Sequence, residues 1–166
     1  MKDLDKSRFA VRIPVKAPVE KIFRSWSTPG GLEHFFLRQA LFHSPEGMKR
    51  EADDAIEVGD TYHWLWWGYS DDDSERGEVL EQNGKDQLRF SFGKAGICTL
   101  SIYEEEGETL VELIQENIPT DDNGFRYYHM GCKQGWSFYL TNLKSVLEGG
   151  IDLRNRNPKL TRVISS

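Results

Sequence analysis

One long amphipathic segment near the end of the chain constrains the fold more than any other feature. Between residues 125 and 148 the apolar side chains recur at the spacing of an α-helix, and Gly149-Gly150 follows as a stop signal. The segments before it are short and β-prone. A sheet needs cover on one face, and this is the only long amphipathic element. The sequence therefore predicts a sheet that packs against one C-terminal helix.

The order of the shorter segments predicts the rest of the architecture. Residues 9–15 alternate apolar and polar side chains, which is the pattern of a half-buried strand. Two short helices follow, and Thr28-Pro29 marks the start of the second. About six antiparallel strands then precede the last helix, and Asn83-Gly84 marks a hairpin among them. The expected fold class is α+β, with a curved antiparallel sheet wrapped around the long helix.

Composition limits the classes of protein that the chain can represent. Its 166 residues fit a single domain, expected at 9–150 between a lead at 1–8 and a polar tail at 151–166 that is extended or poorly ordered. A net charge of −6 argues against nucleic-acid binding, and no stretch is apolar enough to span a membrane. The two cysteines cannot form a disulfide framework. The opening residues lack an apolar leader, which favours a cytoplasmic location.

Three stretches resemble a known superfamily. They are IPVKAPVEKIFRSWSTPGGLEHFF at 13–36, GDTYHWLWWGYSDDDSERGEVLE at 59–81 and GWSFYLTNLKSVLEGG at 135–150. Together they resemble the START-like helix-grip superfamily, also called SRPBCC. The last stretch resembles the branch related to the C-terminal domain of the activator of the heat-shock protein 90 ATPase. The resemblance implies a helix-grip fold, whose members include lipid carriers, cyclases, hormone receptors and co-chaperones, so function must be argued from the site.

The aromatic run from Tyr62 to Trp67 allows two interpretations. Its rings could form the wall of a ligand cavity, since aromatic side chains offer a large apolar area with a polar edge. They could equally be core residues, each contributing about 1.5–3 kcal/mol on burial. Both faces of this strand carry aromatic side chains. Either Tyr62, Trp64 and Trp66 or His63, Leu65 and Trp67 must therefore lie on the face away from the long helix.

Few residues are arranged for catalysis or metal binding. His129 and Cys132 lie three residues apart on the expected helix, which allows an activated thiolate or, more simply, a buried cysteine beside a histidine. The histidines and cysteines lack metal-ligand spacing, and no phosphate-binding loop is present. Glu112 is expected to point outward, because unpaired buried carboxylates are rare. We therefore expect no catalytic residue, no metal and no cofactor.

The first hypothesis for function is a binding module, which the sequence favours over an enzyme. It would hold a small apolar or amphipathic ligand between the sheet and the long helix, and the chain would be a monomer or a homodimer. The alternative is a co-chaperone-like domain that binds a chaperone or another protein, followed by a cyclase-type or hydrolase-type enzyme. The predicted ligand-binding residues are Phe35, Phe36, Trp64, Trp66, Phe90, Phe92, Tyr128, Cys132 and Trp136.

Overall fold

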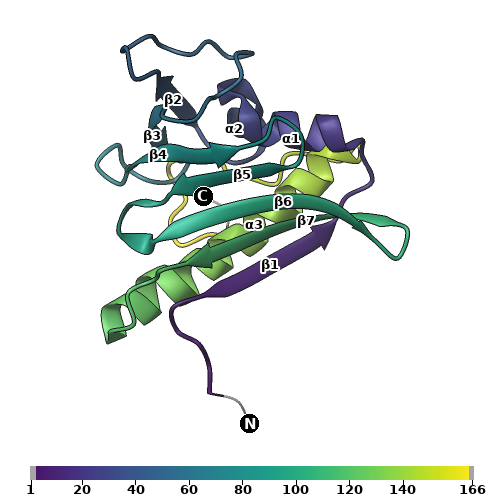
Figure 1. Cartoon of the computed structure of the whole chain (residues 1–166). Coiled ribbons are helices and arrows are strands. Elements are labelled where there is room, and N and C mark those ends of the chain that lie inside the picture. The colour runs from purple at the N-terminus through teal and green to yellow at the C-terminus, as the bar shows by residue number, and fades with distance from the viewer. Residues whose placement is uncertain (1–2, 165–166) are drawn as a thin grey trace.

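Seven strands form one antiparallel sheet in this computed structural model, which describes residues 3–164 (Figure 1). The sheet order is β1-β7-β6-β5-β4-β3-β2, so every neighbour except the β1–β7 pair is also a neighbour in sequence. The strands are β1 (Phe9–Pro14), β2 (Gln39–His43), β3 (Thr61–Leu65), β4 (Glu75–Gln82), β5 (Gln87–Ser91), β6 (Ile97–Glu105) and β7 (Glu108–Glu116). The predicted α+β class and the number of strands are confirmed.

The helices cover one face of this sheet. Helix α3 (Gly131–Leu147) runs along that face, and α1 (Val19–Ser27) and α2 (Pro29–Phe35) stand at one end of it (Figure 1). Thr28 caps α2, since its hydroxyl accepts a hydrogen bond from the N–H of Gly31 at 3.0 Å and Pro29 follows in the first turn. The two short helices and the capping signal agree with the sequence prediction.

The long helix begins differently from the prediction of a single α-helix over 125–148. Its first part, Gly124–Met130, is wound as a π-helix, in which the N–H of Gly131 bonds to the carbonyl of Arg126. Only from Gly131 does the α-helix start. The wider winding changes which residues share a face, so helical spacing counted across the junction misplaces the side chains before it.

Two hairpins show how local residues fix the register of the sheet. Between β6 and β7, Glu106 and Gly107 both have positive φ, of 51° and 78°, as a two-residue hairpin turn requires. The predicted Asn83-Gly84 hairpin joins β4 and β5, but it is not a two-residue turn. The side-chain oxygen of Asn83 accepts hydrogen bonds from three successive backbone N–H groups, at Lys85, Asp86 and Gln87.

Strand β7 presents its apolar face to the helix. Val111, Leu113 and Gln115 are fully buried, whereas Glu112 is only partly buried on the opposite face. The expectation that Glu112 points outward agrees with this placement. The inward Gln115 is the one polar side chain in the row, and it belongs to the site described below.

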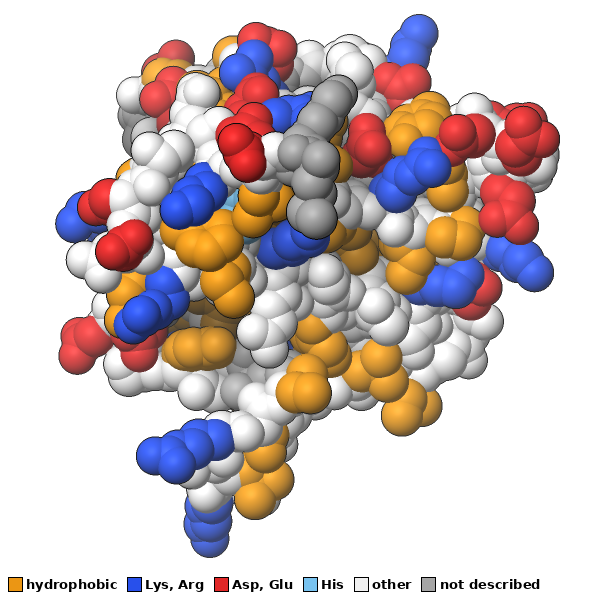
Figure 2. All heavy atoms as spheres, turned by 90° about the horizontal axis from the view of Figure 1, so that it is seen from below, with side chains coloured by type: hydrophobic (Ala, Val, Ile, Leu, Met, Phe, Trp, Pro, Cys, Tyr) orange, Lys and Arg blue, Asp and Glu red, His pale blue; other side chains and the backbone are white. Residues whose placement is uncertain are grey.

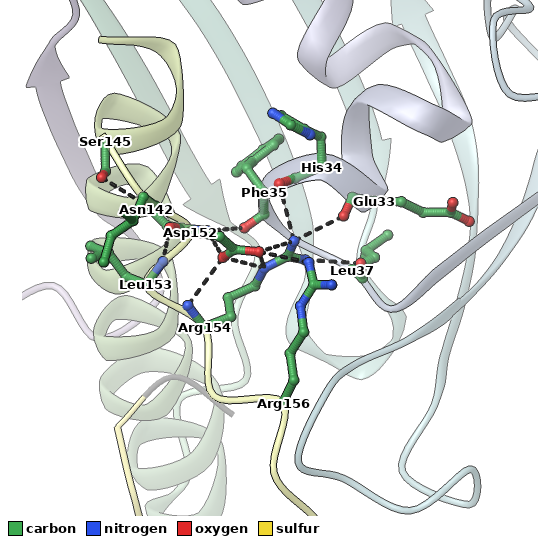
Figure 3. A network of polar contacts seen from close by, with 11 residues as sticks. Glu33, His34, Phe35, Leu37, Asn142, Ser145, Asp152, Leu153, Arg154 and Arg156 are labelled. Carbon is green, nitrogen blue, oxygen red and sulfur yellow. Dashed lines mark hydrogen bonds and ion pairs between the residues drawn. The ribbon is translucent and has the colours of Figure 1, made fainter. Parts of the chain in front are cut away.

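The tail beyond the long helix has no regular secondary structure, but its first residues are fixed to the domain. The guanidinium of Arg154 donates hydrogen bonds to the backbone carbonyls of Glu33, His34 and Leu37, all at 2.9–3.0 Å (Figure 3). Asp152 accepts from Arg154 as well, at 2.8 Å. The tail is thus extended, as one of the two expected states, and Arg154 ties it to the end of α2.

Candidate functional site

An open cavity of about 270 Å³ lies between the first half of α3 and the strand ends that face it. It is small beside common ligand pockets, which measure about 300–1,000 Å³. Aromatic side chains dominate its wall. The lining residues are Phe36, Trp66, Tyr69, Asp73, Phe92, Cys132, Gly135, Trp136 and Tyr139.

Helix α3 supplies one wall of the cavity through a single face. Cys132, Gly135, Trp136 and Tyr139 follow the i, i+3, i+4, i+7 spacing, so they lie along one side of the helix. Gly135 leaves open space at the wall. Apart from the neighbouring backbone of the helix itself, no atom lies within 4 Å of the position that a Cβ would take there. A glycine in mid-helix weakens the helix by about 0.5–1 kcal/mol relative to alanine, and here it adds space beside the cavity.

Aromatic rings from three other segments complete the wall. Phe36 follows α2, Trp66 follows β3 and Phe92 follows β5. The ring of Phe36 lies 4.8 Å from that of Trp136 and 5.8 Å from that of Trp66, and Phe92 lies 5.5 Å from Trp136. These distances are typical of packed aromatic pairs, so the rings form one continuous surface.

Gln115 anchors the inner end of this wall. Its side chain is fully buried, and its amide oxygen accepts a hydrogen bond from the indole N–H of Trp136 at 2.9 Å. The amide nitrogen donates to the carbonyl of Ala95 at 2.9 Å and to that of Tyr128 at 3.3 Å. A buried amide with partners on both ends holds its neighbours in one arrangement. Gln115 therefore fixes the indole of Trp136 against the cavity.

One carboxylate, Asp73, lines the cavity and a second, Glu75, lies near its wall, and neither is paired with a cation among the described residues. Asp73 lines the opening and accepts a hydrogen bond from the hydroxyl of Ser70. Glu75 faces the same side of β4 as the buried Val79, and its carboxylate lies against Gly93, next to Phe92. Burial raises the pKa of Glu75, and the N–H of Arg76 at 2.9 Å opposes that shift. The carboxylate is also close enough to raise the pKa of Cys132.

The structure gives no support to an activated thiolate at Cys132. Burial raises the pKa of this thiol above its ordinary value, which keeps it protonated. His129 lies before the π-to-α junction, where its ring packs on Phe9 and Phe125 and its Nδ1 lies 3.0 Å from the carbonyl of Lys6. No hydrogen bond or ion pair among residues 3–164 joins the histidine to the cysteine. Their spacing of three residues reflects the helix sequence and no shared chemistry.

The structure places five of the nine predicted ligand-binding residues on the cavity wall. These are Phe36, Trp66, Phe92, Cys132 and Trp136.

The remaining four predicted residues lie elsewhere. Phe35, Trp64 and Phe90 are buried core residues that are not among those lining this cavity. Tyr128 contributes its backbone carbonyl to Gln115 and lies in the π-helix. These four residues are therefore next to the cavity wall in this structure, and their role in binding stays a prediction. Strand alternation puts Trp64 and Trp66 on the same face, but Trp64 is covered by Phe36 and Phe92, with ring distances of 5.4 and 6.2 Å.

Sequence analysis missed four lining residues, Tyr69, Asp73, Gly135 and Tyr139. Tyr139 had a usable signal, since it follows Trp136 by three residues and Cys132 by seven on the same helix face. Tyr69 and Asp73 lie in the turn between β3 and β4, and no periodicity determines where a turn folds.

Other classes of site are not found in the part of the chain that the structure describes. Across residues 3–164, no group of three or more histidine, cysteine or acidic side chains is placed to hold a metal ion. None of the helices in that range has the length and apolarity needed to cross a membrane.

The fold and the cavity together define a helix-grip domain. Comparison with known proteins gives the family: residues 16–148 match the model described as Activator of Hsp90 ATPase homolog 1-like protein, and the chain belongs to that family. No curated protein matches the chain.

Several solved structures share the fold. The protein SSP2350 from Staphylococcus saprophyticus has a TM-score of 0.68 and 22% identity, over 89% of this chain and 96% of that one. The Aha1 dimer from Colwellia psychrerythraea has a TM-score of 0.65 and 18% identity, over 86% of this chain and 97% of that one. Protein CV1439 from Chromobacterium violaceum has a TM-score of 0.60 and 20% identity, over 86% and 98%. At these identities the likeness concerns the fold alone.

Proposed function

We propose that the chain is a binding module that holds a small apolar or amphipathic ligand in the cavity beneath the first half of α3. The observation that carries this proposal is the open aromatic wall formed by Phe36, Trp66, Phe92, Trp136 and Tyr139. A ligand that covers the apolar surface of such a concave site gains about 25 cal/mol for each Å² of apolar area buried. The cavity is therefore the surface of this chain best suited to a small molecule.

The way in which the wall is built supports binding over a simple packing defect. Gln115 fixes the indole of Trp136 through a hydrogen bond, and the ring of Phe36 packs at a tilt on Trp136 and edge-on against Tyr139. A wall held in place before a ligand arrives loses little conformational freedom on binding. A merely loose core would leave its side chains without such fixed partners.

Native mass spectrometry of the purified protein tests this proposal. We expect a mass above that of the chain which disappears after denaturation, and the same spectrum distinguishes a monomer from a homodimer. The decisive variant is Gly135→Leu, which adds a side chain beside the cavity where no atom now lies within 4 Å. It should remove the added mass and leave the fold intact.

Gly131→Leu is the matched control, because it adds the same side chain to an exposed glycine of the same helix. If a bound mass survives Gly135→Leu but is lost in Gly131→Leu, the ligand lies elsewhere and the proposal is wrong. A chain without bound mass that also fails to bind any of a panel of small apolar compounds likewise contradicts it.

A second candidate is a protein-interaction domain of the co-chaperone kind. Membership of the Activator of Hsp90 ATPase homolog 1-like family favours it, as do the exposed side chains of Tyr127 and Met130, 59% and 56% exposed. On the face shown in Figure 2, however, apolar side chains form several separate groups between charged ones, and interaction sites are commonly more continuous. This candidate predicts that the purified chain raises the rate of ATP hydrolysis by Hsp90. An unchanged rate at excess chain contradicts it.

A further inference from the structure

We propose that the cavity selects an organic cation, a small amine or quaternary ammonium compound with an apolar part. This inference rests on the proposed binding function and goes further by assigning a charge to the ligand. It stands on three features of the site: an aromatic enclosure, two carboxylates without a cationic partner, and a small volume.

The aromatic enclosure is the first feature. Six of the nine lining residues carry aromatic rings, namely Phe36, Trp66, Tyr69, Phe92, Trp136 and Tyr139. The face of an aromatic ring is negative, so an ammonium group within about 6 Å of a ring centre is attracted by roughly 0.5–2 kcal/mol, depending on its desolvation. Several rings around one small cavity add such contributions. A neutral apolar ligand would gain from burial alone.

The second feature is the pair of carboxylates, Asp73 and Glu75. Their negative charge attracts a cation, as the faces of the rings do. Asp73 lines the cavity, and the carboxylate of Glu75 lies against Gly93, the residue after the lining residue Phe92. Within residues 3–164, no lysine or arginine forms an ion pair with either of them. The nearby Arg38 is already bound, since it pairs with Asp71 and stacks over Trp67.

Glu75 is the more informative of the two carboxylates. A half-buried carboxylate without a cation among the described residues is unfavourable, and burial raises the pKa of Glu75. The carboxylate of Glu75 lies against Gly93, beside the lining residue Phe92, and Glu75 is two residues from Asp73 in the sequence. A cationic ligand would provide the missing partner, whereas an anionic ligand would be repelled by both groups.

The volume sets the size of the ligand. A cavity of about 270 Å³ admits a small molecule or the head of a larger one, and not a complete lipid. The net charge of −6 on the whole chain adds a weak attraction for cations from a distance.

Two probes of nearly equal shape test the role of the charge. Choline carries a trimethylammonium group, and 3,3-dimethylbutan-1-ol replaces it by a neutral tert-butyl group. Trp66 and Trp136 line the cavity, so binding of either probe can be followed by tryptophan fluorescence and by calorimetry. At a mildly alkaline pH we expect choline to bind at least about tenfold more tightly than the alcohol.

Variants of the carboxylates locate the source of this preference. Glu75→Gln and Asp73→Asn keep the shape of each side chain and remove its charge, and we expect each to weaken choline binding by about fivefold or more. Glu78→Gln is the matched control, since Glu78 is exposed on the opposite face of the same strand. The control and the affinity for the alcohol should stay unchanged.

The outcomes separate this inference from the proposed function. Equal or tighter binding of the alcohol overturns the charge preference and leaves an apolar binding module. Choline binding that Glu75→Gln and Asp73→Asn do not weaken also overturns it. If neither probe binds at millimolar concentration, and the protein carries no bound mass, both proposals fail.

Discussion

A partly buried carboxylate lies near each end of the long helix, and the pKa values of the two groups shift in opposite directions. At the C-terminal end, burial alone would raise the pKa of Asp152, but hydrogen bonds from Arg154 and Arg156 outweigh it and lower the pKa far below its usual range (Figure 3). At the cavity end, burial raises the pKa of Glu75, and only one backbone N–H opposes it. Asp152 pairs with Arg154 and Arg156, whereas Glu75 has no cationic partner within residues 3–164.

The difference separates an end of the domain that is closed by ion pairs from the end at which we propose that a ligand binds. The Asp152 end is closed: Arg154 is 1% exposed at its side chain and has acceptors for its donors on α2 and Asp152. The Glu75 end is open, with space beside Gly135 and rings that face a cavity. Unsatisfied charge and empty space lower stability, and proteins keep them mainly where a ligand completes the site.

The largest effect is expected at the closed end. Asp152→Asn leaves the buried guanidinium of Arg154 without a counter-charge, so the free energy of unfolding should fall by about 3 kcal/mol. Urea denaturation of the two proteins measures this difference.

Asp53→Asn is the control for that variant, because Asp53 pairs with Arg24 at the surface and its side chain is 89% exposed. It should change stability by less than about 0.5 kcal/mol. Equal effects of the two variants would show that the tail is not a structural lock.

Two glycines provide the next contrast. A Cβ at Gly31 would lie 2.4 Å from the carbonyl oxygen of Arg24, so Gly31→Ala should destabilise the protein by about 1–3 kcal/mol. A Cβ at Gly135 meets no atom within 4 Å, so Gly135→Ala should stabilise the helix by about 0.5–1 kcal/mol. Thermal unfolding distinguishes the signs. Destabilisation by Gly135→Ala would contradict the presence of open space there.

The smallest effect concerns the pH dependence at Glu75. The folded-state pKa of Glu75 lies above its unfolded value, so ionisation destabilises the folded chain progressively as pH rises from about 4 through the folded-state pKa. Glu75→Gln should therefore match the wild type in acid and be more stable by up to about 1 kcal/mol at neutral pH, since partial exposure screens the charge.

Asp152 has the opposite sign, and this makes the comparison sharper. Its folded-state pKa is lowered, so its contribution to stability is present above about pH 4 and is lost as pH falls through the folded-state pKa. Denaturation curves between acid and neutral pH should show Glu75→Gln and Asp152→Asn diverging in opposite directions. Parallel curves would contradict the assignment of the two carboxylates.

The fold was more accessible from sequence than the site, for physical reasons. Strand alternation and helical spacing are repeated over many residues, so β7 and the long helix were predicted within a few residues. The π-helical winding before Gly131 and the three hydrogen bonds that the side-chain oxygen of Asn83 accepts depend on single local geometries that no periodic pattern encodes. The family resemblance, which rested on three stretches of sequence, is confirmed.

The residues that line the cavity are harder to predict, because periodicity gives the face on which a side chain lies and not which neighbours cover it. Alternation placed Trp64 and Trp66 on the same face, but only packing by Phe36 and Phe92 makes Trp64 core and leaves Trp66 at the opening. Asp73 stands in an acidic turn whose sequence is typical of solvated surface, and Glu75 begins the next strand, β4. No periodic pattern predicts that this turn lies at the cavity.

The two cysteines report most directly on whether the cavity is open. Cys132 lines it, while Cys98 is fully buried in the core behind. With a small methanethiosulfonate reagent and intact-mass detection, Cys132 should be labelled in the native protein and Cys98 only after unfolding. Gly135→Leu should slow the labelling of Cys132 severalfold, and Gly131→Leu should not. A Cys132 as unreactive as Cys98, or a rate insensitive to Gly135→Leu, would contradict an open cavity under the first half of α3.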